Sequence, residues 1–319
     1  VIFWPMTVST EVHCLACGSN DMSHWATAHD IEYYAVSEAF EYNLCADCGA
    51  LSITNPPKYR LSEIYPDNYY SFSENGMSWL MRVKQWFDER QFRHLFSKVQ
   101  GEKLSALDVG GGAGWLLSVA RTVEPRLDYT MVVDLDAAAQ DHARAAGHDF
   151  YLGPVETYRT DTRFDVIFML NLIEHVEDPR LVLRKMRELL KPGGVIFLKT
   201  PSHDSLDAHW FRNDSWGGLH CPRHWVIFTP ESFAKAANQA GLVVREMNLT
   251  QGAPFWTVSI LNMLKKAGLV KISKESPVVD HPLFGPIGAV AAAFDMVRGV
   301  FMRTSQMFVT LESAEGGRG

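Results

Sequence analysis

From residue 104 onward, hydrophobic positions follow two alternating patterns. Short, mostly apolar runs have the length of buried strands, and longer stretches between them repeat apolar residues every three or four positions, as on one helix face. The runs predict strands at residues 106–109, 129–133, 164–170, 195–199, 242–247 and 306–311, and the stretches predict helices at 115–121, 137–146, 181–190, 256–267 and 287–302. Strands alternating with helices indicate an α/β fold with a mostly parallel sheet.

The first 103 residues have a different organisation. Residues 31–44 alternate loosely and are rich in Tyr and Phe, which predicts the strands of a small ribbon. The break Asn55-Pro56-Pro57-Lys58 indicates a boundary, and residues 77–99 predict an amphipathic helix. Between them, the aromatic turn at 65–70 is a possible site element. We therefore expect an N-terminal module at 1–57, a linking helical lid at 58–103 and the α/β domain at 104–319, with a helical insertion at 250–304.

Charge and hydropathy restrict the classes of partner and location. The chain has 30 Lys and Arg against 37 Asp and Glu, a net charge of −7, which argues against nucleic acid as a partner. No Lys or Arg precedes Lys58, so a secretory signal is not expected and the predicted location is cytoplasmic. The longest charge-free apolar stretch, 282–294, is too short to span a bilayer.

Four cysteines near the N-terminus form two closely spaced pairs. Two residues separate Cys14 from Cys17 and Cys45 from Cys48. This spacing lets both sulfurs of a pair reach one ion, and two pairs complete a tetrahedral zinc shell with no open position for a catalytic water. Two disulfides or a redox dithiol are the alternatives, but one needs an oxidising compartment and the other needs no duplicate. The pattern predicts a structural zinc ribbon.

A glycine-rich loop follows the first strand of the α/β domain. Asp108 precedes three alternating glycines, Gly110, Gly112 and Gly114, and such a loop at a helix N-terminus typically binds a nucleotide-like ligand. The dinucleotide fingerprint G-x-G-x-x-G does not fit, because its third glycine would fall on Trp115. Nicotinamide dinucleotide is therefore a weaker candidate. One strand further on, Asp134 could accept hydrogen bonds from both hydroxyls of a ribose.

At these motifs the sequence resembles class I S-adenosylmethionine (SAM) dependent methyltransferases, in particular bacterial members with an N-terminal four-cysteine zinc module. The similarity runs from Cys14 to about Met247 and includes Leu107–Gly114, Asn171–Val176 and Leu190–Gly194. It implies a Rossmann-like seven-stranded sheet whose last strand is antiparallel. It also implies SAM contacts from Asp108, Gly110, Gly112, Gly114, Asp134, Leu135 and Asn171. Where the family often has an acidic adenine contact, this chain has Gly153-Pro154-Val155-Glu156, so backbone atoms or Glu156 would take that part.

Three histidines are candidates for a catalytic base on the acceptor side: His175, His220 and His224. For each one, ordering a loop through hydrogen bonds is an equally good interpretation. A metal cluster of Cys221 with His220 and His224 is a weaker alternative. Methyl transfer needs little acid or base assistance when donor and acceptor are well aligned, so proximity alone is a further possibility.

The resemblance implies methyl transfer to a small-molecule acceptor such as a sugar, a glycan precursor or a secondary metabolite. The competing hypotheses are a nicotinamide oxidoreductase and a non-catalytic scaffold that binds a partner through the ribbon. The apolar helix at 287–302 could pack inside the protein, pair in a dimer or contact a membrane surface, and a peripheral membrane contact through 282–303 fits a lipid-linked acceptor. The sequence specifies neither the oligomeric state nor the methylated atom.

Overall fold

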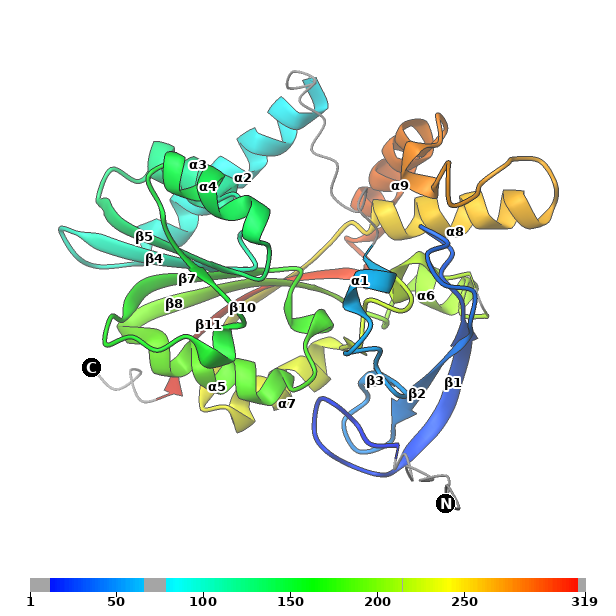
Figure 1. Ribbon diagram of the computed structural model, residues 1–319, viewed down its shortest axis with the longest axis horizontal. Helices are drawn as coiled ribbons and strands as arrows, with labels where there is room; N and C mark the ends of the chain where they lie inside the picture. Colours follow the sequence, from blue (N-terminus) through cyan, green and yellow to red (C-terminus); the bar gives the residue numbers. More distant parts are fainter. Residues whose placement is uncertain (1–11, 66–78, 214, 315–319) are drawn as a thin grey trace, which may run out of the picture.

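The computed structural model describes residues 12–65, 79–213 and 215–314, and its centre is a seven-stranded sheet (Figure 1). The strand order is β10-β11-β8-β7-β4-β5-β6. Strands β4 to β8 run parallel, whereas β11 is antiparallel to both β8 and β10. The bounds are β4 Leu104–Val109, β5 Leu127–Asp134, β6 Asp149–Leu152, β7 Phe164–Leu170, β8 Leu190–Pro201, β10 Leu242–Thr250 and β11 Gln306–Ser313. The expected seven-stranded, Rossmann-like α/β fold is confirmed.

Helices cover both faces of this sheet (Figure 1). One face packs α2 Trp79–Ser97, α3 Trp115–Val123 and α4 Ala137–Ala145, and the other packs α5 Pro179–Leu189 and α7 Pro230–Gln239. Successive side chains of a strand point to opposite faces of the sheet, so a strand that is apolar throughout can bind helices on both faces. In β7, Phe168 packs with Phe92 of α2, while Ile167 lies in the cluster that contains α5. The C-terminal half of α2 is thus an outer layer of the sheet.

Strand β8 begins earlier than the sequence predicts. Leu190 pairs with Phe164, and the register shifts before Val195 pairs with Val166. Residues 191–194, between the expected helix and strand, therefore lie inside β8 as a bulge, with Gly193 at φ +77°.

A second, four-stranded antiparallel sheet contains the N-terminal segment. Its order is β1 Met22–Ala28, β2 Phe40–Cys45, β3 Leu51–Ile53 and β9 Val226–Ile227. The strand expected across residues 31–39 was wrong. Asp30 accepts hydrogen bonds from the backbone N–H groups of Tyr33 and Ala35, and this turn interrupts the extended chain.

The insertion after β10 forms two packed helices, α8 Ala253–Lys266 and α9 Phe284–Arg298. Helix α8 is largely buried, and its Ser259 hydroxyl accepts a hydrogen bond from the N–H of Gly217. Helix α9 and the residues after it leave large apolar side chains exposed: Val290, Phe294, Met296, Val297, Val300, Phe301 and Met302. Among the described residues, no helix combines the length and hydrophobicity required to cross a bilayer.

Short helices and turns complete the chain. The helices are α1 Leu61–Ile64 and α6 Leu206–Trp210, and the 3-10 turns are η1 Val155–Thr157, η2 Ile173–His175, η3 Gly217–Leu219 and η4 Val278–Asp280. Two of these turns, η2 after β7 and η3 before β9, carry the predicted histidines or lie next to them. Turn η2 contacts β8 of the large sheet and β9 of the small one, and η3 contacts α8.

Candidate active site

The glycine loop at the end of β4 adopts the conformation that its sequence predicts. Gly110, Gly112 and Gly114 all have positive φ angles, of 75°, 50° and 78°. Side chains rarely tolerate this region, so the alternating glycines are required by the backbone itself. At Gly114 there is also no space, because a Cβ would lie 2.5 Å from Cδ2 of His148.

Two carboxylates, Asp108 and Asp134, lie against this loop. Asp108 is buried, with its Oδ2 close to Gly111, and this oxygen has no hydrogen-bond partner. Asp134 accepts a hydrogen bond from the N–H of Gly112 on Oδ2 and from that of Asp136 on Oδ1, both at 2.8 Å. Burial, and then the charge of Asp134, raises the pKa of Asp108 to about 7. The charged form of Asp108 is thus disfavoured, and a cationic group placed beside Asp108 would stabilise it.

The other predicted cofactor residues lie at the same edge of the sheet. Leu135 follows Asp134 at the end of β5 and is 63% exposed, which is unusual for a leucine. Asn171 follows β7 with φ +52°, and its N–H donates to the carbonyl of Lys199. Glu156 lies in η1 after β6 and is half-buried. The cofactor roles of these residues stay predictions.

The structure brings the three predicted histidines together. The ring centroids of His175 and His224 lie 4.8 Å apart, those of His220 and His224 5.0 Å, and those of His175 and His220 6.2 Å. They come from two segments, because His175 ends η2 and the other two follow η3. A hydrogen bond from the N–H of Trp225 to the carbonyl of Glu174 joins these segments. The cluster lies near the glycine loop, because Leu172, three residues before His175, packs against Gly110.

Backbone carbonyls and one carboxylate fix the orientation of these rings. Nδ1 of His175 lies 2.9 Å from the carbonyl of Arg223, and Nδ1 of His224 lies 2.8 Å from that of Gly218, so each Nδ1 carries the proton. Desolvation lowers the pKa of His175 to about 3 and that of His224 well below its usual value, with the neighbouring histidines adding to both effects. Nδ1 of His220 instead contacts a carboxylate oxygen of Glu32.

The N-terminal segment contributes residues to this cluster that were not among the predicted site residues. Besides Glu32, the hydroxyl of Tyr65 lies 3.2 Å from Nδ1 of His175, which brings one residue of the aromatic turn into the site. Residues 66–70 of that turn lie outside the described residues. Asp30 forms a fully buried ion pair with Arg223. A sequence pattern gives no sign of such long-range partners, and it assigns no role to Glu174, which lies within the motif at 171–176.

The four predicted metal-ligating cysteines converge at the far end of the N-terminal sheet. Their sulfur atoms all lie within 4.8 Å of one another, and the Sγ–Sγ distances are 3.6 Å for Cys14–Cys48 and for Cys17–Cys45. A tetrahedral ZnS₄ centre with Zn–S bonds of about 2.3 Å requires about 3.8 Å between sulfurs. Gly18 and Gly49, after each pair, have φ angles of 83° and 79°. The donor set and its spacing fit a zinc ion.

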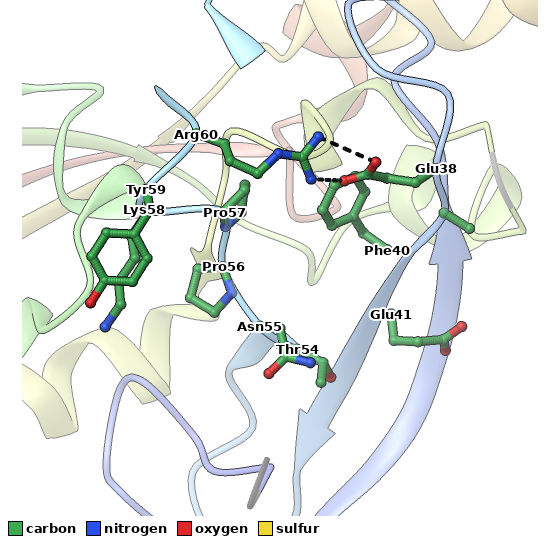
Figure 2. Close-up of a pocket in the computed structure, with 11 residues that line it drawn as sticks. Glu38, Phe40, Glu41, Thr54, Asn55, Pro56, Pro57, Lys58, Tyr59 and Arg60 are labelled. Atoms are coloured by element: carbon green, nitrogen blue, oxygen red, sulfur yellow. Dashed lines mark hydrogen bonds and ion pairs between the residues drawn. The ribbon is translucent and has the colours of Figure 1, made fainter. Parts of the chain in front are cut away.

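A surface groove of about 500 Å³ lies beside the N-terminal sheet (Figure 2). It is lined by residues 38–41 and 54–60, and the guanidinium of Arg60 pairs with Glu38 (Figure 2). The same guanidinium pairs with Glu63 of α1. Tyr59 is 90% exposed, with the ammonium of Lys58 over its ring. The groove is open and contains none of the predicted catalytic or metal-ligating residues, so the candidate active site remains at the edge of the large sheet.

Comparison with known proteins identifies relatives of the central part of the chain. A family model described as "Methyltransferase domain" matches residues 72–247, more than half of the chain. Three relatives named ubiquinone biosynthesis O-methyltransferase come from Aeromonas salmonicida, Chelativorans and Pseudomonas aeruginosa. They are 28%, 36% and 34% identical over 160, 163 and 179 residues, which is 46%, 46% and 51% of this chain.

The alignments leave part of each relative unmatched. The chain covers 66%, 61% and 71% of the lengths of these three proteins, so it spans just under two thirds of the Aeromonas relative. Among solved structures, coclaurine N-methyltransferase bound to N-methylheliamine and SAH aligns with a TM-score of 0.48 and 17% identity, covering 81% of each chain. At that TM-score the likeness is only general.

Proposed function

The chain belongs to the methyltransferase-domain family, and from this premise we propose that it transfers a methyl group from SAM to a small-molecule acceptor. The observation that carries the proposal is the meeting of two sets of residues at one sheet edge. Leu172 links the two sets, because its side chain lies against Gly110 of the glycine loop and its carbonyl accepts a hydrogen bond from the N–H of His175. The carboxyl edge of a parallel sheet is where such folds bind ligands.

The residues of the glycine loop fit SAM in charge and shape. Asp108 offers a buried carboxylate oxygen without a partner, which suits the positively charged methionine part. Asp134 has one N–H donor on each oxygen, so each oxygen keeps acceptor capacity for a ribose hydroxyl. Leu135 offers apolar surface for the adenine ring, and Asn171 directly follows the end of β7.

SAM supplies a methyl group that is already activated by its sulfonium. The protein then has to orient an acceptor and receive its proton. We assign the proton to Nε2 of His220, because its Nδ1 donates to Glu32 and Nε2 therefore keeps its lone pair. His175 and His224 are weaker bases, since desolvation lowers the pKa of each. The relatives are named O-methyltransferases, which favours an acceptor hydroxyl.

The cysteine cluster takes structural zinc in this proposal, and the N-terminal zinc module at 1–57 precedes the segment 58–103 and the methyltransferase domain at 104–319. Four thiolates complete the shell of the ion, so its role is to hold the loop before β1 against the turn that follows β2. Metal analysis should find about one zinc ion per chain at the cysteine cluster, in addition to any metal bound elsewhere. A Cys14→Ser, Cys48→Ser variant that folds normally would contradict this part.

The exposed apolar residues from Val290 to Met302 support a peripheral membrane contact through 282–303, which suits a lipid-linked acceptor. Flotation with anionic vesicles measures this contact, and a double variant with Val300→Ser and Phe301→Ser should bind the vesicles less than the original protein does. Binding that these two changes leave unaltered would contradict it.

Calorimetry with SAM and with NAD tests the cofactor, and turnover to S-adenosylhomocysteine with a panel of hydroxylated small molecules tests the reaction. SAM should bind and NAD should not. Asp134→Ala should weaken SAM binding by about 1–3 kcal/mol, the cost of losing hydrogen bonds to a charged acceptor. SAM binding without turnover on any acceptor would favour the scaffold hypothesis, and unchanged affinity in the variant would contradict the ribose assignment.

A further inference from the structure

We propose that Glu174, His175 and His224 form a second metal site, separate from the cysteine cluster, that binds a divalent transition-metal ion. A ring nitrogen of each histidine and a carboxylate oxygen of Glu174 all lie within 4.8 Å of one another. Two imidazoles and one carboxylate are a donor set that zinc, cobalt and iron(II) accept. The role of this ion in catalysis rests on the proposed function, but its binding does not.

The two histidines are oriented as metal ligands are. In metal sites a ligating imidazole typically donates its other N–H to a carbonyl or carboxylate, which fixes the tautomer. Nδ1 of His175 donates to the carbonyl of Arg223, and Nδ1 of His224 donates to that of Gly218. Each Nε2 therefore carries a lone pair, and Nε2 of His224 faces Oε1 of Glu174 at 3.9 Å.

Glu174 provides the independent sign of a ligand. Its side chain is only 1% exposed, and Oε1 has no hydrogen-bond partner, whereas Oε2 accepts a hydrogen bond from the hydroxyl of Thr200 at 2.9 Å. An unpartnered buried carboxylate oxygen is costly. The separation of 3.9 Å from His224 is too long for a direct hydrogen bond but lets a metal ion between the two atoms contact both after a small contraction.

The ligands come from two segments that the backbone holds together. Glu174 and His175 belong to η2 after β7, and His224 follows η3. The hydrogen bond from the Trp225 N–H to the Glu174 carbonyl, 2.7 Å long, fixes their separation. Three protein ligands leave coordination positions open, as in catalytic rather than structural sites. An ion here would bind an oxygen of the acceptor and ease its deprotonation beside His220.

Cobalt(II) is the probe for this site, applied to the chain after a single equivalent of zinc has filled the cysteine cluster, because four thiolates take zinc ahead of two imidazoles and one carboxylate. We expect one Co²⁺ per chain, with weak d–d absorption, no sulfur-to-cobalt charge transfer, and only nitrogen and oxygen neighbours at the cobalt X-ray absorption edge. Changes in outer-shell groups alone cost about 10–100-fold in metal affinity. Glu174→Gln and His224→Gln should therefore each weaken Co²⁺ binding by more than about tenfold.

The matched control is His220→Gln, since the ring of His220 lies close to both histidines but outside the ligand group. This variant should keep Co²⁺ affinity within about threefold of the original protein. Circular dichroism checks the fold of each variant. If Glu174→Gln does not fold, the X-ray absorption edge spectrum of the unaltered protein with Co²⁺ is the deciding measurement. No Co²⁺ binding, sulfur neighbours, or affinity unchanged in both ligand variants would overturn the site. SAM calorimetry runs in parallel, so a chain that binds SAM but not Co²⁺ refutes only this proposal, whereas one that binds Co²⁺ but not SAM refutes the proposed function.

Discussion

The buried ion pair between Asp30 and Arg223 joins the N-terminal segment to the loop at 220–225, which carries His220 and His224 and is called the histidine loop below. Loss of this pair should destabilise the whole protein. The residues are 193 positions apart, both side chains are 0% exposed, and the guanidinium donates two hydrogen bonds at 2.9 and 3.2 Å. The change to make is Arg223→Met, which keeps most of the side-chain volume and removes the charge. Asp30 is then left as a buried carboxylate without its cation.

The expected cost follows from the contacts. Hydrogen bonds to charged groups contribute about 1.5–3 kcal/mol each, so two give about 3–6 kcal/mol. Removing one partner of a buried ion pair typically costs about 3–5 kcal/mol. Both routes predict that Arg223→Met lowers the free energy of unfolding by about 3–5 kcal/mol. Asp30→Asn with Arg223→Met should restore part of this loss, since no buried charge remains.

The pH dependence of this loss has a definite sign. Burial alone would raise the pKa of Asp30, but the hydrogen bonds and charge of Arg223 outweigh it and hold that pKa below its usual value. The pair therefore stabilises the fold above the unfolded pKa of about 3.9 and loses this effect as the pH falls through the folded pKa. In Arg223→Met the buried Asp30 can be protonated. The difference between the two proteins should be largest near pH 7 and shrink toward pH 4.

Urea denaturation followed by tryptophan fluorescence, at several pH values and with zinc constant, measures this difference. A matched control is Arg245→Met, because Arg245 also pairs with a carboxylate, Glu312, but at the surface, where such a pair contributes about 0–1 kcal/mol. A loss below about 1 kcal/mol in Arg223→Met, or a loss that grows as the pH falls, would refute this reasoning.

Three further predictions concern the cofactor loop and the metal cluster. Because burial raises the pKa of Asp108 to about 7, SAM affinity should rise with pH up to about 7 and then level off, and Asp108→Asn should flatten this dependence in calorimetry. Gly114→Ala should destabilise the protein by at least about 1 kcal/mol in urea denaturation, since it combines positive φ with a clash against His148; a neutral effect would contradict the loop geometry. Chelation of the cysteine-bound metal should lower the thermal midpoint, and an unchanged midpoint would argue against structural zinc.

Local patterns in the sequence predicted the large sheet well. The apolar run at Phe164–Leu170 matches β7 at both ends, because a strand buried on both faces reads as a continuous hydrophobic segment. The N-terminal segment was harder. Residues 31–39 have strand-like composition, but the side chain of Asp30 takes the backbone N–H groups that a strand would use.

The candidate site was predicted residue by residue but not as an arrangement. The spacing within each cysteine pair and within the glycine loop predicts the local geometry directly, because these residues are close together in the sequence. The proximity of His175 to His224, and of Glu32 to His220, depends on how distant segments pack. No periodicity encodes such contacts, and buried charges such as Asp30 and Glu174 become visible only once the fold is known.

The last strand of the small sheet has a consequence for how the chain is made. Strand β9 is synthesised only after β4 to β8, yet it pairs with β3 and completes the sheet that begins with the cysteine pairs. During synthesis, domains tend to fold as units in order from the N-terminus. Strands β1 to β3 therefore emerge before β9, and the edge of β3 stays unpaired until then. We expect the nascent N-terminal segment to depend on metal or a chaperone until the histidine loop is synthesised, so that the two parts of the chain mature in a single step.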